Sequence, residues 1–149
     1  MASYLVDTNV LLRMSDSTSS MNLLAGQTAA QLLEQNNELL ITSQVIIEFW
    51  VVATRPVNVN GLGWDVEQTH NEVQQILNQF PQLEEKPDIF PYWLDLVTRY
   101  QLQGKRVHDA RLVAVMLAHD VTHLLTFNPT DFKLIAEISV VTPQDISTF

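Results

Sequence analysis

The chain contains no cysteine, few glycines and few basic residues. Its 149 residues include only four Gly, and the absence of Cys excludes disulfides and thiolate metal sites. Eight Lys and Arg residues are set against 17 Asp and Glu residues, which gives a formal net charge of −9 at pH 7. Because excess negative charge repels phosphates, any contact with nucleic acid has to be local or assisted.

The sequence also lacks long apolar runs. None approaches the roughly 20 residues of a membrane span, and the first residues have neither the basic charge nor the apolar length of a signal peptide. We therefore expect a cytoplasmic protein with no membrane association. With 46% hydrophobic residues, a chain of this length suits one compact core, so we expect a single domain over residues 1–149.

Short apolar runs alternate with segments of helical spacing. The short runs, which predict buried strands, are residues 3–6, 39–42, 122–127 and 138–141. The helical patterns predict helices over about 9–14, 21–37, 43–52, 65–80 and 91–100, and from 109 onward. This alternation predicts an α/β fold with three layers and a mostly parallel central sheet of four or five strands.

Turn-forming and capping residues predict where these elements end. Ser43 is the expected N-cap of the helix after the second strand, and Gly104 is the expected stop of the helix over 91–100. The segment 81–88 is expected to be a polar connection. Asn-Pro-Thr-Asp at 128–131 is good turn sequence.

Several polar residues border or interrupt the apolar runs. Asp7 follows the first predicted strand, Asp109 opens the last predicted helix, and Glu48 lies within an apolar helical segment. Asn128 and Asp131 follow the strand at 122–127. Open α/β sheets bind ligands at the carboxyl ends of their strands, and Mg²⁺ and Mn²⁺ prefer carboxylate oxygens. We expect these positions to build one metal site.

Each acid also has an ordinary structural explanation. Asp7 and Asp109 are favoured N-cap residues. The structural explanation of Glu48 is an ion pair with Arg13 or Arg55, because an unpaired buried carboxylate costs several kcal/mol. The shared placement of these acids at one edge of the sheet nevertheless favours a site over separate coincidences.

Four segments of the chain resemble PIN domains, in particular VapC-type toxin ribonucleases. They are VDTNVL (6–11), SQVIIEF (43–49), VHDARL (107–112) and LTFNPTDF (125–132), in the family's order and spread across almost the whole chain. The resemblance implies a doubly wound α/β/α fold. It also implies clustered acids that bind Mg²⁺ or Mn²⁺ for RNA hydrolysis.

Carried over by position, Asp7, Glu48 and Asp109 match the three central metal-binding acids. Many relatives have an acid where this chain has Asn128, so either Asn128 or Asp131 is expected to complete the catalytic set. Clustered acids repel one another, so at least one should have a raised pKa without metal.

The residues around the acids have expected roles as well. Thr8, Asn9 and Thr126 are expected to orient the acids by hydrogen bonds. A basic cluster around Asp109 is expected to hold RNA phosphates, and its members are Lys105, Arg106, His108 and Arg111. The alternative for this cluster is a solvated helix start.

The resemblance implies a metal-dependent endoribonuclease that leaves a 5′-phosphate and a 3′-hydroxyl. It further implies the toxin component of a type II toxin–antitoxin pair, a homodimer, and a small antitoxin whose basic arm enters the active site. A noncatalytic PIN-like module that binds RNA or protein is the alternative. Asn128 and the net charge of −9 favour that alternative.

Overall fold

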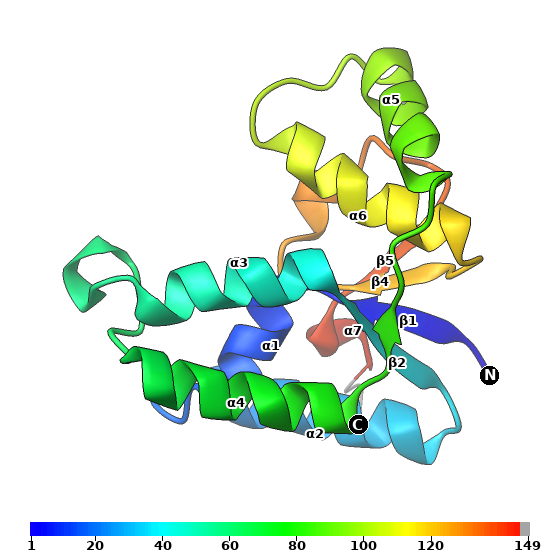
Figure 1. Cartoon of the computed structure of the whole chain (residues 1–149). Helices are drawn as coiled ribbons and strands as arrows, with labels where there is room; N and C mark the ends of the chain where they lie inside the picture. The colour runs from blue at the N-terminus through cyan, green and yellow to red at the C-terminus, as the bar shows by residue number, and fades with distance from the viewer. Residues whose placement is uncertain (147–149) are drawn as a thin grey trace.

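The computed structural model describes residues 1–146, which contain a five-stranded sheet covered by helices on both faces (Figure 1). The strand order is β3-β2-β1-β4-β5, and every adjacent pair is parallel. The predicted α/β fold is confirmed. The strands are β1 (Ser3–Val6), β2 (Glu38–Thr42), β3 (Gln82–Leu83), β4 (His123–Leu125) and β5 (Ser139–Val141).

The helices form the two outer layers. Figure 1 shows α5 and α6 on one side of the sheet, whereas α1 to α4 and α7 pack together on the other side. Within residues 1–146, none of the helices combines the length and the hydropathy that a membrane span requires. The helices are α1 (Thr8–Ser15), α2 (Asn22–Glu34), α3 (Ser43–Thr54), α4 (Val66–Gln79), α5 (Ile89–Arg99), α6 (Arg106–Ala118) and α7 (Pro143–Ile146), with 3₁₀ turns η1 (Val57–Val59) and η2 (Pro129–Phe132).

The central strands are apolar because helices cover both of their faces. Leu5, Ile41 and Leu124 are completely buried in β1, β2 and β4. The chain passes from β1 to β2 on one side, and β4 pairs with β1 on the other. The strand order therefore reverses between β1 and β4, and a doubly wound sheet opens a ligand crevice at such a point.

Some predicted boundaries were wrong for local reasons. The segment 81–88 contains β3, whose two residues are too few for a strand pattern. Thr42 rather than Ser43 caps α3, because the Thr42 hydroxyl accepts a backbone N–H one turn later. Gly104 does not stop α5, since Gln101 already adopts the left-handed conformation (φ 52°) after the helix ends. The four-residue α7 was not predicted.

Candidate functional site

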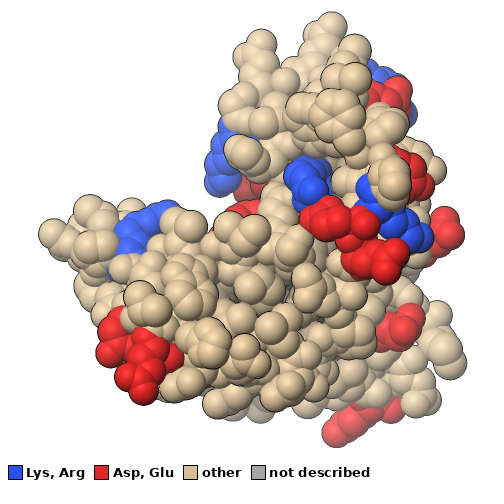
Figure 2. Space-filling model, viewed as in Figure 1, with Lys and Arg blue, Asp and Glu red and all other residues tan. Residues whose placement is uncertain are grey.

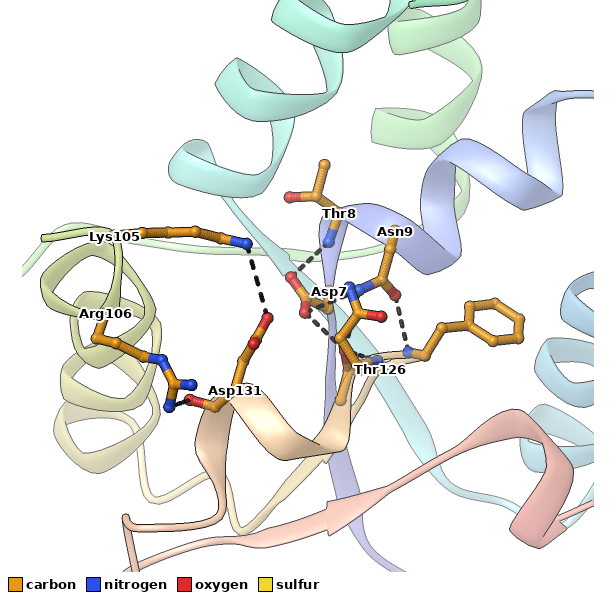
Figure 3. A network of polar contacts seen from close by, with 9 residues as sticks. Asp7, Thr8, Asn9, Lys105, Arg106, Thr126 and Asp131 are labelled. Atoms are coloured by element: carbon orange, nitrogen blue, oxygen red, sulfur yellow. Dashed lines mark hydrogen bonds and ion pairs between the residues drawn. The ribbon is translucent and has the colours of Figure 1, made fainter. Parts of the chain in front are cut away.

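Asp7 stands at the carboxyl end of β1, where three donors hold its carboxylate (Figure 3). Oδ1 accepts the Thr8 backbone N–H at 2.8 Å. Oδ2 accepts the Thr126 hydroxyl at 2.8 Å and the Asn9 side-chain amide at 3.3 Å. Burial raises the pKa of Asp7, although the bonds from Thr126 and Thr8 act in the opposite direction. The carboxylate caps α1 and also lies at the sheet edge, so the two explanations of Asp7 are compatible.

Thr126 and Asn9 tie the end of β4 to the start of α1. The Asn9 amide nitrogen donates to the buried Thr126 hydroxyl at 3.0 Å, and the Asn9 side-chain carbonyl accepts the Phe127 backbone N–H at 2.9 Å. Thr8 contributes differently, because its hydroxyl points to the Val45 carbonyl at 3.5 Å. Two of the residues expected to orient the acids therefore contact Asp7 through side chains, and Thr8 does so through its backbone.

Glu48 lies half-buried on α3 and is held by a neutral partner. Its Oε1 accepts the Gln44 side-chain amide at 2.9 Å, one helical turn earlier. Burial raises the pKa of Glu48, the Gln44 bond lowers it, and the Asp7 charge raises it. Among residues 1–146 no Lys or Arg forms an ion pair with Glu48. Arg13, one expected partner, instead lies over the Phe127 ring at 4.5 Å.

Asp109 lies in the first turn of α6, which begins at Arg106, so the prediction that Asp109 opens this helix was wrong by one turn. Asp109 Oδ2 is buried and accepts no hydrogen bond in the described part of the chain. Burial raises the pKa of Asp109 to about 6, with smaller contributions from the charges of Asp131 and Asp7. An unpaired buried oxygen is costly, and the charge and oxygen chemistry of this carboxylate fit a divalent cation.

The turn η2 brings Asp131 toward the acids and leaves Asn128 exposed. The Asp131 charge raises the pKa of both Asp7 and Asp109. Its carboxylate lies 3.9 Å from Lys105 Nζ, as Figure 3 shows. Asn128 accepts or donates no side-chain hydrogen bond within residues 1–146, while its backbone N–H donates to the Thr126 hydroxyl at 3.0 Å.

Some of the basic residues near Asp109 form hydrogen bonds or ion pairs with other residues of the protein. Arg106 donates to the Asp131 carbonyl at 3.2 Å, and Arg111 pairs with Glu85 at 2.9 Å. His108 is exposed. Figure 2 shows acidic and basic side chains gathered where the α5 and α6 layer meets the rest of the molecule, beside a largely uncharged face over α3 and α4.

A cleft of about 480 Å³ opens beside the acids. Glu48 and Asp109 line it together with Lys105 and the exposed His108. An adjoining cleft of about 330 Å³ is lined in part by Phe90 and Trp93 of α5. Glu48 and Asp109 are therefore open to a ligand from the side of α6.

No three Asp, Glu or His side chains among residues 1–146 lie close enough together to form a finished metal site. The donors nevertheless fit Mg²⁺ or Mn²⁺, because Asp7, Glu48 and Asp109 all have raised pKa values and Asp109 has an unpaired oxygen. A cation would offset the repulsion among these acids. Their oxygens would have to draw together around it.

Sequence reasoning missed Gln44 and Glu85. The Gln44 amide nitrogen also donates to the His108 carbonyl at 2.9 Å, and Glu85 accepts the Ser43 hydroxyl at 2.7 Å. The i,i+4 spacing of Gln44 and Glu48 was an available signal for their contact. Glu85 lies in the connection after β3, where no local pattern indicates its partners.

Residues 4–138 match the family described as the PIN domain. No curated protein sequence matches the chain. The structure is similar to VapBC2 from Rickettsia felis bound to a DNA fragment from its promoter, with a TM-score of 0.71 and 19% identity over 94% of this chain and 98% of that chain.

Two further solved structures share this architecture. A toxin–antitoxin complex from Klebsiella pneumoniae has a TM-score of 0.59 and 26% identity, over 94% of this chain and 97% of that chain. VapC20 from Mycobacterium tuberculosis, a Sarcin-Ricin loop cleaving toxin, has a TM-score of 0.58 and 14% identity, over 81% and 86% respectively. The family match spans most of the chain and the fold agrees with it, so this protein belongs to the PIN domain family.

Proposed function

We propose that this protein is a metal-dependent endoribonuclease and the toxin component of a type II toxin–antitoxin pair. The observation that carries the proposal is the placement of Asp7, Glu48 and Asp109 at one edge of the sheet, where burial raises the pKa of each and the Asp7 charge adds to the effect on Glu48 and Asp109. Their raised pKa values fit a site that functions with a divalent cation. The similar solved structures include a toxin–antitoxin complex and a Sarcin-Ricin loop cleaving toxin, which supports the same class of activity.

In the proposed site Asp7, Glu48 and Asp109 bind Mg²⁺ or Mn²⁺, and Asp131 completes the catalytic set in place of the exposed Asn128. Bound metal supplies an activated water and offsets charge on the phosphate. Thr126 and Asn9 hold the Asp7 carboxylate in one orientation through their hydrogen bonds. Asp109, whose pKa is raised to about 6, is mostly ionised at neutral pH and is ready to accept the cation.

The proposed RNA path follows the cleft beside Glu48 and Asp109. Lys105 and His108 line it and are exposed, so they are placed to meet phosphate oxygens. Arg106 and Arg111 have partners inside the protein, and we assign them mainly to holding the site. Hydrolysis would leave a 5′-phosphate and a 3′-hydroxyl.

We further propose that residues 1–149 act as one domain, that the chain forms a homodimer in the cytoplasm, and that a small antitoxin inhibits it. The single sheet supports the first point. Exposed apolar side chains on α3, Ile47 and Val51, suit a protein contact. Size-exclusion chromatography with light scattering, with and without a co-expressed antitoxin, tests the assembly.

The enzyme proposal is tested by incubating purified protein with single-stranded and structured RNA in Mg²⁺, Mn²⁺ or EDTA. We expect cleavage only with metal, and Asp7→Ala should reduce it about 1,000-fold, because removing a metal ligand forfeits several kcal/mol of transition-state stabilisation. Asp88→Ala, at an exposed aspartate remote in sequence from the acids, is the matched control. Equal cleavage by wild type and Asp7→Ala would refute the enzyme assignment.

The second candidate is a noncatalytic module that binds RNA or protein. The net charge of −9 and the exposed Asn128 in place of an acid favour it. Calorimetry separates the two functions. RNA binding that survives EDTA, with no cleavage products, would identify a binding module, whereas metal-dependent cleavage identifies the nuclease.

A further inference from the structure

We infer that Gln44 is a positioning residue for the acid site, because its side-chain amide holds Glu48 and joins α3 to the first turn of α6. The inference rests on the proposed function, since it concerns the metal that Glu48 would bind. It adds a residue that neither the family resemblance nor the cluster of acids assigns.

The amide group of Gln44 bridges two helices. Its nitrogen donates to Glu48 Oε1 at 2.9 Å within α3, and to the backbone carbonyl of His108 in α6 at 2.9 Å. His108 directly precedes Asp109. The neutral amide of Gln44 is therefore hydrogen-bonded both to Glu48 and to the peptide group that joins His108 to Asp109.

Arg111 fixes which way this amide faces. Its guanidinium donates to Gln44 Oε1 at 3.4 Å and to Glu85 at 2.9 Å. Arginine has no acceptor, so the carbonyl side of Gln44 has to face Arg111 and the amino side has to face Glu48. Glu85 is anchored in turn by the Ser43 hydroxyl at 2.7 Å, which closes a ring of contacts around the start of α3.

This arrangement leaves Glu48 suited to bind a cation. Gln44 occupies Oε1, so Oε2 is the oxygen that remains for metal. A carboxylate restrained by a neutral donor keeps its charge and loses little further freedom on binding. The bond to the His108 carbonyl also limits how far α6 can move from α3, and thus the separation of Glu48 from Asp109.

The inference is tested with the full chain by titrating Mn²⁺ into metal-free protein without RNA, using calorimetry or electron paramagnetic resonance. Gln44→Met keeps the length of the side chain and removes both polar groups. We expect Mn²⁺ to bind about tenfold more weakly, and kcat for RNA cleavage to fall with little change in KM. Gln75→Met, at an exposed glutamine on α4, is the matched control and should bind Mn²⁺ as wild type does.

Arg111→Lys separates positioning from direct RNA contact. Lysine keeps the charge but cannot reach Gln44 and Glu85 together through a planar fork. We expect weaker Mn²⁺ binding, in the same direction as Gln44→Met. If Arg111 only contacted RNA, KM would rise and Mn²⁺ affinity would stay at the wild-type value. If Gln44→Met fails to fold, the Mn²⁺ affinity of Arg111→Lys tests the inference in its place.

Mn²⁺ affinity and kcat within twofold of wild type in folded Gln44→Met would overturn the inference. That outcome differs from a failure of the proposed function. In the latter case wild type itself would neither bind Mn²⁺ nor cleave RNA. Circular dichroism and thermal unfolding of each variant confirm that the proteins compared are folded.

Discussion

At the scale of single residues, Asp109 is the acid whose surroundings most favour the proposed cation site. Its Oδ2 is buried without a hydrogen-bond donor among residues 1–146, and the neighbouring Asp131 and Asp7 add negative charge. A carboxylate in such surroundings destabilises the metal-free fold. Asp7, by contrast, has three donors and also caps α1, so it contributes to the fold as well as to the site.

We expect Asp109→Asn to stabilise the metal-free protein at pH 7.5 by about 1 kcal/mol. This figure is smaller than the full pKa shift of Asp109 would give, because the side chain is only half-buried and solvent screens its charge. The pKa of Asp109 is raised from 3.8 to about 6 by folding. Between these values the folded state binds more protons than the unfolded state, so this group's contribution to the unfolding free energy falls as pH rises and levels off above about pH 6. Urea denaturation in EDTA from about pH 3 to about pH 8, a range that spans both pKa values, measures it.

The comparison uses Asp88→Asn, which removes one exposed carboxylate and should follow the wild-type pH profile. The stabilisation should disappear in Mn²⁺, because wild type then gains the free energy of metal binding. An Asp109→Asn protein that is less stable than wild type in EDTA at pH 7.5 would contradict the account of this carboxylate.

At the scale of elements, two short segments that are separated along the chain complete the site. The first turn of α6 carries Asp109, and η2 carries Asp131. Arg106 ties them together through its bond to the Asp131 carbonyl, with Lys105 near the Asp131 carboxylate. The side chains that connect the segments are those that sequence reasoning assigned to RNA.

We expect Asp131→Asn to lower kcat/KM for RNA cleavage by about tenfold, and Asn128→Ala to leave it within about twofold. The reason is electrostatic, because the Asp131 charge reaches both Asp7 and Asp109, whereas Asn128 is neutral and exposed. Asp131→Asn should also lower the pKa of Asp109 in the metal-free protein, which carbon NMR of the carboxyl groups measures. A larger loss of cleavage in Asn128→Ala would instead assign the fourth position to Asn128.

The sequence predicted the long helices and four of the five strands, but not β3 or α7. Helices such as α2 and α4 have enough turns for apolar spacing to show, and β1 and β2 are continuous apolar runs. The two-residue β3 and the four-residue α7 are too short for a periodic signal. The start of α6 was placed too late because Arg106 and His108 are polar and at least partly exposed, and thus do not mark a buried face.

At the scale of the whole molecule, topology determines which distant residues meet. The sheet order places β1 beside both β2 and β4, which brings Asp7 to Thr126 although 119 positions separate them. Residues at strand ends could be predicted because parallel strands share a carboxyl edge. The hydrogen-bond partners of Arg111 and Glu85 could not be predicted, because these contacts depend on how helices from different layers pack.

We expect Mn²⁺ at 100 times its dissociation constant to raise the unfolding free energy of the protein by about 2.7 kcal/mol, since the ion binds the folded state alone. The net charge of −9 means that acidic side chains repel one another, and a bound cation would reduce this repulsion. Thermal unfolding with Mn²⁺, with EDTA, and with both tests this shift, and Asp109→Asn should show a smaller one. An unfolding temperature that does not respond to Mn²⁺ would mean that the acids bind no metal.

The proposed nuclease function requires that the acids at the carboxyl edge of the sheet hydrolyse RNA with a bound metal. The most direct measurement is the single-turnover cleavage rate of end-labelled RNA by wild type and Asp109→Asn over a range of Mn²⁺ concentrations. We expect wild-type cleavage to rise with Mn²⁺ and saturate, to vanish in EDTA, and to fall about 1,000-fold in the folded variant. Equal rates for the two proteins, or rates independent of Mn²⁺, would contradict it.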